Sequence, residues 1–164
     1  MTPKLEALVE RLSDCRDISS LQSSLLAADL EACDVADYIR FDRDGYSRNR
    51  VLKTDKFEVL ILCWRPGQKS KIHNHADSIC AFKIIKGALK NTNFIQQGQR
   101  VSVTSTKDIS CSQPVVLSGS NNFHKIANDS ASNAVSLHFY APPIGHYHVV
   151  DQEKALVLIE EAVL

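Results

Sequence analysis

The chain has 164 residues, of which 44% are hydrophobic and 23% are charged, and this is the size and apolar content of one globular domain. Nineteen basic and nineteen acidic residues cancel, and no run of Lys or Arg is long enough to follow a phosphate backbone, so nucleic acid is not an expected partner. No apolar run approaches the length that crosses a bilayer, so a membrane is not expected either.

The five cysteines, Cys15, Cys33, Cys63, Cys80 and Cys111, form an odd set with no CxxC pair and no framework spacing. This pattern argues against a disulfide scaffold and against a zinc knuckle. The first twenty residues mix charged and apolar positions. We therefore expect a soluble cytoplasmic protein whose thiols are reduced.

The first forty residues carry apolar positions at helical spacing. From Thr2 to about Asp17 the pattern predicts an amphipathic helix, with Thr2 as its cap and Pro3 at its first position. Its apolar face would consist of Leu5, Leu8, Val9 and Leu12. Residues 21–26 and 34–39 continue the apolar periodicity, so a helical cap of two to three helices is expected over residues 1–42.

After Phe41 the sequence changes to short runs rich in β-branched or aromatic residues, separated by Gly, Asn, Asp or Pro. The runs lie at Val51, 57–62, 79–85, 101–103 and 135–140. This pattern favours an antiparallel barrel or sandwich over residues 43–164, within a single domain. Residues 153–164 are apolar without clear periodicity and fit either a strand or a short helix.

Two of the six histidines, His73 and His75, are separated by one residue. On a strand such residues point to the same face, so both imidazoles can reach one ion. Most isolated pairs of this kind are surface or structural histidines, but the surrounding sequence favours a metal site.

The stretch from Gly67 to Gly87 fits the first motif of the cupin superfamily, except that Cys80 stands where the motif has an acid. The second cupin motif survives only as His124 and Asn128. The two motifs together predict a three-histidine site, His73, His75 and His124, on the inner wall of a barrel.

Losing the carboxylate changes the electrostatics of such a site. Three neutral imidazoles leave a divalent ion with its full charge, so the site attracts an anionic ligand. A thiolate is soft and negatively charged and would bind iron strongly. An octahedral ion with three protein ligands keeps three positions open, enough for a substrate that binds through two atoms and for dioxygen.

The cysteine at position 80 and the stretch SLHFYAPP, residues 136–143, carry a more specific resemblance. From about residue 38 to residue 151 the chain resembles the cysteine dioxygenases. Within that span four segments look like family blocks in the right order: 46–49, 60–64, 73–87 and 135–143. The resemblance implies a mainly β fold, a cupin-type antiparallel β-barrel (jelly roll) behind the helical cap.

The resemblance also implies the chemistry. A single Fe²⁺ would be held by the three histidines, L-cysteine would bind it through sulfur and amine, and both atoms of O₂ would be transferred to sulfur to give cysteine sulfinic acid. Arg48 matches the family arginine that grips the substrate carboxylate, with Tyr46 beside it; a guanidinium fork suits a carboxylate. Without the surrounding blocks, Arg48 would be taken for an ordinary surface strand residue. From the neighbouring block, Leu62 and Trp64 are predicted to bind substrate.

Tyr140 is the candidate for a phenol aimed at the bound dioxygen or substrate. Ser136, His138 and Tyr140 alternate on one strand face, so a relay in which Ser136 orients His138 and His138 orients Tyr140 is expected, as the family uses. In animal members the cysteine that matches Cys80 is linked to this tyrosine by a thioether. Cys80 could equally be a small buried hydrophobe. The family also has a cis peptide bond where this chain has Ala141 followed by Pro142.

Several departures leave alternatives open. Gln68 raises the possibility of a 3-mercaptopropionate dioxygenase, because that related group uses a glutamine nearby in place of the arginine. A more distant alternative is another metal cupin, an isomerase or a sensor, and a third is a metal-free binding module. Tyr147 stands where animal members have a pocket cysteine. His146 and His148 are expected in a loop without a direct role, although His148 matches a family position and could support the site. Nothing in the pattern demands a dimer, so a monomer is expected.

Overall fold

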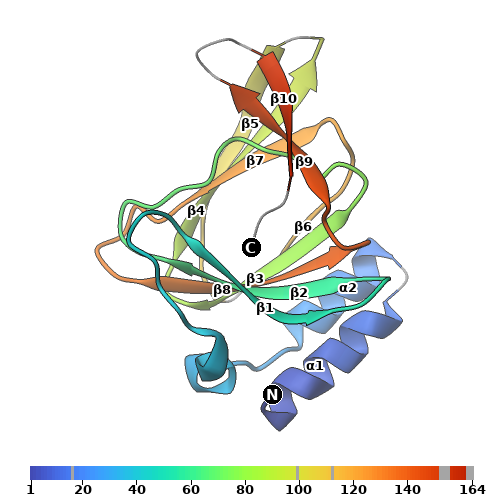
Figure 1. The fold of residues 1–164 in the computed structure, drawn as a ribbon, viewed down its shortest axis with the longest axis vertical. Coiled ribbons are helices and arrows are strands. Elements are labelled where there is room, and N and C mark those ends of the chain that lie inside the picture. The colour runs from blue at the N-terminus through green and yellow to red at the C-terminus, as the bar shows by residue number, and fades with distance from the viewer. Residues whose placement is uncertain (16, 99, 112, 152–155, 162–164) are drawn as a thin grey trace.

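A computed structural model describes residues 1–15, 17–98, 100–111, 113–151 and 156–161. The chain begins with α1 (Pro3–Asp14), α2 (Ile18–Leu26) and the 3₁₀ helix η1 (Ala32–Tyr38) (Figure 1). The Thr2 hydroxyl accepts a hydrogen bond from the Leu5 amide, which confirms the predicted cap. The first helix ends at Asp14 rather than near Asp17, because Asp17 is itself the N-cap of α2 and accepts from the Ser20 amide at 2.8 Å.

The strands form two antiparallel layers. The first sheet has the order β1-β2-β8-β3-β6, with β1 (Ser47–Lys53), β2 (Glu58–Trp64), β3 (Ile79–Lys86), β6 (Val115–Leu117) and β8 (Ala134–Ala141). The second layer contains β5-β4-β7, with β4 (Leu89–Gln97), β5 (Arg100–Ile109) and β7 (Asn122–Ala127), and the hairpin of β9 (His146–Asp151) and β10 (Leu156–Glu161).

The segment between β2 and β3 joins the parts of the second layer. Lys69 forms an isolated bridge with Ala127, and His73 forms bridges with both His124 and Val149. This segment therefore runs between β7 and β9. The two sheets do not close into a barrel, but the arrangement is that of a jelly roll with a helical cap, and the predicted mainly β fold class is confirmed.

One element differs from the sequence prediction, and the structure decides one choice that the sequence left open. Residues 146–151 form β9 rather than a loop, because this strand pairs with β10, which follows it in a hairpin, and with the segment at His73, which is distant in sequence. Residues 156–161 form a strand, which answers the open choice for that part of the tail; residues 153–155 and 162–164 lie outside the described residues.

The central strands of the first sheet are buried on both faces. On β8 the side chains of Val135, Leu137 and Phe139 pack with α1 and α2, as do alternate residues of β2 and β3. The intervening residues point to the interior between the two sheets. Figure 1 shows the helices on the face of this sheet that lies away from β4, β5 and β7. Such double burial explains why β2 is almost continuously apolar, and it extends along nearly all of β8, which carries the polar Ser136 and His138 on its interior face.

A buried lysine on the first sheet forms hydrogen bonds to the helical layer. Lys83 on β3 is only 8% exposed, and its Nζ donates to the carbonyl oxygens of Leu25 at 3.1 Å and Ala28 at 2.5 Å. These carbonyls lie at the C-terminal end of α2, where a helix leaves acceptors unpaired and attracts a cation. Among the described residues, no helix is long and apolar enough to span a membrane.

Candidate active site

The three motif histidines converge between the two sheets. His124 lies on β7, and His73 is bound to it by two backbone hydrogen bonds, from His73 N to His124 O at 2.9 Å and from His124 N to His73 O at 2.8 Å. The potential ligand atoms of His73, His75 and His124 all lie within 4.8 Å of one another. The Nε2 atoms of His75 and His124 are 3.3 Å apart. One small ion can therefore contact all three rings.

The spacing of His73 and His75 predicted that they lie on a strand, but in the structure they lie on no named strand. Its position comes from the bridges at His73 and from the buried side chain of Asn74. Asn74 Oδ1 accepts from the amides of Ala76 at 3.1 Å and His148 at 3.0 Å, and its Nδ2 donates to the Ser120 carbonyl at 2.6 Å. Asn74 thus connects the turn that carries His73 and His75 to β9 and to the loop before β7.

In two of the three histidines, His73 and His124, the Nδ1 atom lies within hydrogen-bond distance of a neighbouring oxygen. His73 Nδ1 lies 2.9 Å from the carbonyl oxygen of Lys71, and His124 Nδ1 lies 2.9 Å from Oδ1 of Asn91. Because a carbonyl oxygen can only accept, each Nδ1 carries the proton and each Nε2 presents its lone pair to the site. This is the arrangement expected of metal-binding histidines, so the residues present fit a divalent ion.

Burial keeps these imidazoles neutral. It lowers the pKa of His73 to about 4 and the pKa values of His75 and His124 well below the ordinary 6.5. The clustered group contains three histidines and no carboxylate within the described part of the chain. A divalent ion placed here would keep its full charge.

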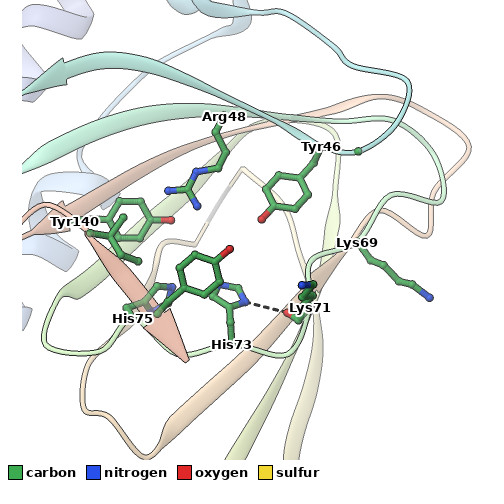
Figure 2. A pocket seen from close by; sticks show the side chains of 10 residues that line it. Tyr46, Arg48, Lys69, Lys71, His73, His75 and Tyr140 are labelled. Carbon is green, nitrogen blue, oxygen red and sulfur yellow. Dashed lines mark hydrogen bonds between the residues drawn. The ribbon is translucent and has the colours of Figure 1, made fainter. Parts of the chain in front are cut away.

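A cavity of about 240 Å³ opens beside the histidines. Figure 2 shows Arg48, Tyr46 and Tyr140 on one side of it and His73 and His75 on the other. Ten residues line it: Gly45, Tyr46, Arg48, Lys69, Lys71, His73, His75, Tyr140, Ile144 and Tyr147. The ionisable side chains in this lining include three cations and no acid, so the cavity favours an anionic ligand.

Arg48 brings an unmatched donor into this cavity. It lies on β1, its guanidinium carbon is 5.9 Å from the centre of the Tyr140 ring, and its Nε is buried without a hydrogen-bond partner. Burial opposes its charge, but the electrostatic effects of the neighbouring tyrosines Tyr140, Tyr46 and Tyr147 and of Glu58 together outweigh burial and raise the pKa of Arg48. A permanently charged fork with a vacant donor is suited to a carboxylate.

The predicted relay residues are hydrogen-bonded in sequence. Tyr140 Oη lies 3.3 Å from His138 Nδ1, and His138 Nε2 lies 2.9 Å from Ser136 Oγ. All three are buried on the interior face of β8. Trp64 extends the chain, because its Nε1 donates to Ser136 Oγ at 3.0 Å. Tyr140 alone of these residues lines the cavity.

Cys80 on β3 pairs across the sheet with Tyr140 on β8. Burial raises the pKa of the Cys80 thiol to about 12 and raises that of Tyr140 well above its ordinary value, so both groups are protonated at neutral pH. The two side chains are close enough to affect each other's pKa. The Ala141–Pro142 peptide bond that follows is cis.

Leu62 and Trp64, which the sequence suggested as substrate contacts, are not among the residues that line this cavity. Trp64 lies behind Tyr46, with the ring centres 4.2 Å apart and the planes nearly parallel. Leu62 stands opposite Arg48 across β1 and β2 and is buried. Both residues support cavity-lining neighbours.

Gln68 also lies outside this cavity lining. Its Oε1 accepts from the Arg65 amide at 2.8 Å and its Nε2 donates to the Asp42 carbonyl at 3.1 Å. Both ends of the amide are thus engaged by the backbone.

Sequence reasoning missed several residues of the site. Asn74 and Asn91 were not singled out, because an asparagine between or beside histidines carries no signal until its partners are known. Ile144 and the two lysines of the lining were also missed. Tyr147 was noted only as a departure, yet it lines the cavity with its ring centre 5.8 Å from that of His73.

Comparison with known proteins agrees with this geometry. Residues 4–153 match the family described as cysteine dioxygenase type I. The chain is 34% identical over 141 residues to cysteine dioxygenase type 1 of Rattus norvegicus, covering 83% of this chain and 70% of that protein. The human protein is 33% identical over the same coverage, and that of Danio rerio is 32% identical over 161 residues, covering 90% of this chain and 79% of its own.

Solved structures agree with the fold. A Klebsiella pneumoniae protein with a double-stranded β-helix domain matches with a TM-score of 0.55 at 17% identity, covering 78% of this chain and 95% of that one. The cupin domain of Schizosaccharomyces pombe Cnp3 matches with a TM-score of 0.53 at 12% identity, covering 65% of this chain and 70% of that one. At these identities the likeness concerns the fold alone.

Proposed function

Because the chain belongs to the cysteine dioxygenase type I family, and is thus an oxidoreductase of the dioxygenase class, we propose that it is a mononuclear iron enzyme. Its reaction would be the oxidation of L-cysteine with O₂ to cysteine sulfinic acid. The observation that carries the proposal is the meeting of two features in one cavity. The face with His73 and His75 offers a metal site, and Arg48 offers a buried, unmatched donor on the other side.

We assign the metal to Fe²⁺, one per chain, held by His73, His75 and His124. Three neutral nitrogen ligands on one side of an ion leave open positions opposite, which suits iron that must accept both a substrate and a gas. Bound there, iron would supply the redox chemistry that couples a thiolate to O₂. The neighbours Lys71 and Asn91 fix the orientation of two of the rings through their Nδ1 atoms.

The residues of the cavity would orient the substrate. Arg48 would bind the cysteine carboxylate, and this directs the thiol and amine of so small a molecule toward the histidines. Tyr46 lies beside Arg48 in the same wall, and Tyr147 and Ile144 also line the cavity (Figure 2). Leu62 and Trp64 would support this wall as neighbours, Leu62 opposite Arg48 on the adjacent strand and Trp64 stacked on Tyr46.

Tyr140 would place its hydroxyl against the substrate or dioxygen, with His138 and Ser136 aligning it. We also propose that Cys80 and Tyr140 form a thioether. The new bond joins the sulfur to a ring carbon with loss of one hydrogen from each, and O₂ is the oxidant that takes up the two electrons and two protons.

A second candidate substrate is 3-mercaptopropionate, which has the same thiol and carboxylate but no amine. Gln68, the residue that raised this alternative, has both ends of its amide bound to backbone atoms and lies outside the cavity lining. The cavity is lined by Arg48, in place of which the 3-mercaptopropionate group uses a glutamine, and this favours L-cysteine. The family match disfavours the more distant reading of an isomerase or sensor cupin.

We further propose a single-domain, monomeric, cytoplasmic enzyme, with a cap at residues 1–42 and the jelly roll at 43–164. The helical layer shares one core with the first sheet, which supports a single folding unit. All five cysteines lie among the described residues and none forms a disulfide, which fits a reducing compartment.

The test is oxygen uptake by the iron-loaded protein with L-cysteine and, separately, with 3-mercaptopropionate. We expect a preference for L-cysteine, and we expect Arg48→Ala to raise the KM for it by about tenfold to a hundredfold, the cost of one charge-assisted carboxylate contact. Arg50→Ala, at an exposed position on the same strand, is the matched control. A preference for 3-mercaptopropionate would leave a thiol dioxygenase but reject the substrate, and no uptake with either thiol would reject the proposed function.

A further inference from the structure

Trp64 extends the relay on β8 by one residue beyond Ser136. Its indole is 1% exposed, Ser136 is fully buried, and the Trp64 Nε1 to Ser136 Oγ distance is 3.0 Å. Trp64 ends β2, where it pairs with Ala134 across the sheet, so the contact is fixed by the register of two central strands. The result is a continuous path of hydrogen bonds from Trp64 to the cavity.

We propose that Trp64 sets the direction of every hydrogen bond in this path, so that Tyr140 presents its phenolic proton to the ligand in the cavity. An indole nitrogen can only donate. Ser136 Oγ therefore accepts from Trp64. Its own proton is buried and still needs an acceptor, and among the hydrogen bonds of the described residues the only one within reach is His138 Nε2, 2.9 Å away. Each later step follows from this first one.

The tautomer of His138 then fixes the direction of the next hydrogen bond, the one between His138 and Tyr140. A neutral imidazole that accepts at Nε2 carries its single proton on Nδ1. His138 Nδ1 then donates to Tyr140 Oη, 3.3 Å away. His138 is 1% exposed, and Phe82 stacks on it with ring centres 4.8 Å apart and planes 4° apart, which holds the ring plane in line with both neighbours.

The Tyr140 hydroxyl, the last group in the path, must therefore act as a donor toward its remaining neighbour. Because Tyr140 Oη accepts from His138, its own proton points away from the relay, toward Cys80 or toward a ligand in the cavity. The group it faces must then be an acceptor, such as a thiolate sulfur or a partly reduced oxygen. This deepens the proposed function and rests on it: Trp64 is a positioning residue that makes the site selective for acceptor groups.

The chain contains a single tryptophan, which permits a clean test. Replacing tryptophan throughout the protein by β-(3-benzothienyl)alanine changes Trp64 alone, substitutes sulfur for N–H, and keeps the ring shape that stacks on Tyr46. The readout is the ¹⁵N spectrum of His138 in the full chain loaded with Zn²⁺, a diamagnetic divalent ion. Bare and protonated ring nitrogens have distinct shifts, so the tautomer is observed directly.

We expect the natural protein to carry the His138 proton on Nδ1, and the benzothienyl protein to shift toward the Nε2–H tautomer. Ser136→Ala, which cuts the path between Trp64 and His138, should give the same shift. A natural protein protonated at Nε2 would overturn the inference, and so would an unchanged tautomer in both altered proteins.

Kinetics of the iron-loaded protein give a second readout. The benzothienyl protein should lose about tenfold in kcat while its KM for L-cysteine stays within about twofold, because Arg48 is untouched and one buried hydrogen bond is lost. If KM rises while kcat stays constant, Trp64 acts on binding and not through the relay. Oxygen uptake failing in the natural protein, with the expected tautomer present, would reject the proposed function and leave the direction of the hydrogen bonds intact.

Discussion

Cys80 and Tyr140 stand directly opposite each other on β3 and β8, both buried on the interior face of the first sheet. Opposed residues of an antiparallel pair have Cβ atoms about 4.5–5.5 Å apart, which brings a thiol within reach of a facing phenol ring. After aerobic incubation with Fe²⁺ and L-cysteine, we expect a species lighter by two hydrogens in the intact mass. Peptide mapping should assign the link to these two residues.

The controls for this crosslink follow from the alternation of the sheet. Cys80→Ser should remove the mass change. Cys63→Ser should retain it, because Cys63 is buried among the residues that face the helices. If the lighter species persists in Cys80→Ser, the linked pair has been misassigned.

The pH dependence of metal binding follows from burial. Protons compete for an imidazole lone pair only below the imidazole pKa, and burial lowers that of His73 to about 4 and those of His75 and His124 below 6.5. Affinity for Zn²⁺ should therefore change by less than about tenfold between pH values of about 7.5 and 5.5. Competition against a chelator of known pH dependence measures this. Three histidines of ordinary pKa would lose about a thousandfold over that interval, and such a loss would contradict the prediction.

Asn91 should control metal affinity without touching the metal. Its Oδ1 holds His124 Nδ1 at 2.9 Å, and removing such a partner usually costs about tenfold to a hundredfold in affinity. Asn91→Ala should therefore bind Zn²⁺ more weakly by about that factor, measured by the same competition. Thr92→Ala, at the next position of β4, is the matched control, since Thr92 contacts Thr106 on β5. Equal affinities for the two variants would show that His124 needs no such support.

Lys83 should matter for stability rather than for activity. Lys83→Met fills similar space but removes both donors from the carbonyls of Leu25 and Ala28, at a cost of about 1–3 kcal/mol in the free energy of unfolding. Urea unfolding followed by far-UV circular dichroism measures the difference. Lys86→Met, exposed on the same strand, should change it by less than about 0.5 kcal/mol. If Lys83→Met is more stable than the natural protein, desolvation of the amine outweighs its hydrogen bonds.

Sequence reasoning succeeded where a motif or the two-residue period of a strand predicts which side chains lie together. His73, His75 and His124 were predicted from two motifs and meet in space. Ser136, His138 and Tyr140 were aligned by the two-residue period of a strand, and their side chains are hydrogen-bonded in the predicted order. The order of the relay follows from the local strand period, whereas the meeting of His124 with the other two histidines was predicted only by the two motifs together.

The sequence could not reveal contacts between distant segments. Trp64 was expected to bind substrate, but its strand places it behind Tyr46, and only the folded sheet shows that it reaches Ser136. Likewise, the prolines before His146 predicted a loop, whereas the bridge between Val149 and the distant His73 helps to make β9 a strand. Pairings over such separations depend on partners that no local window contains.

The alternation of β8 couples the chemistry of the site to the folding of the helical cap. A slip of one residue would turn Val135, Leu137 and Phe139 away from the helices and bring Ser136, His138 and Tyr140 against them. That exchange would bury hydroxyl and imidazole groups under leucines and lose the apolar contacts at the same time. The cap lies on the far side of the sheet from the cavity. Its packing thus favours the one register of β8 in which Ser136, His138 and Tyr140 face the interior between the two sheets.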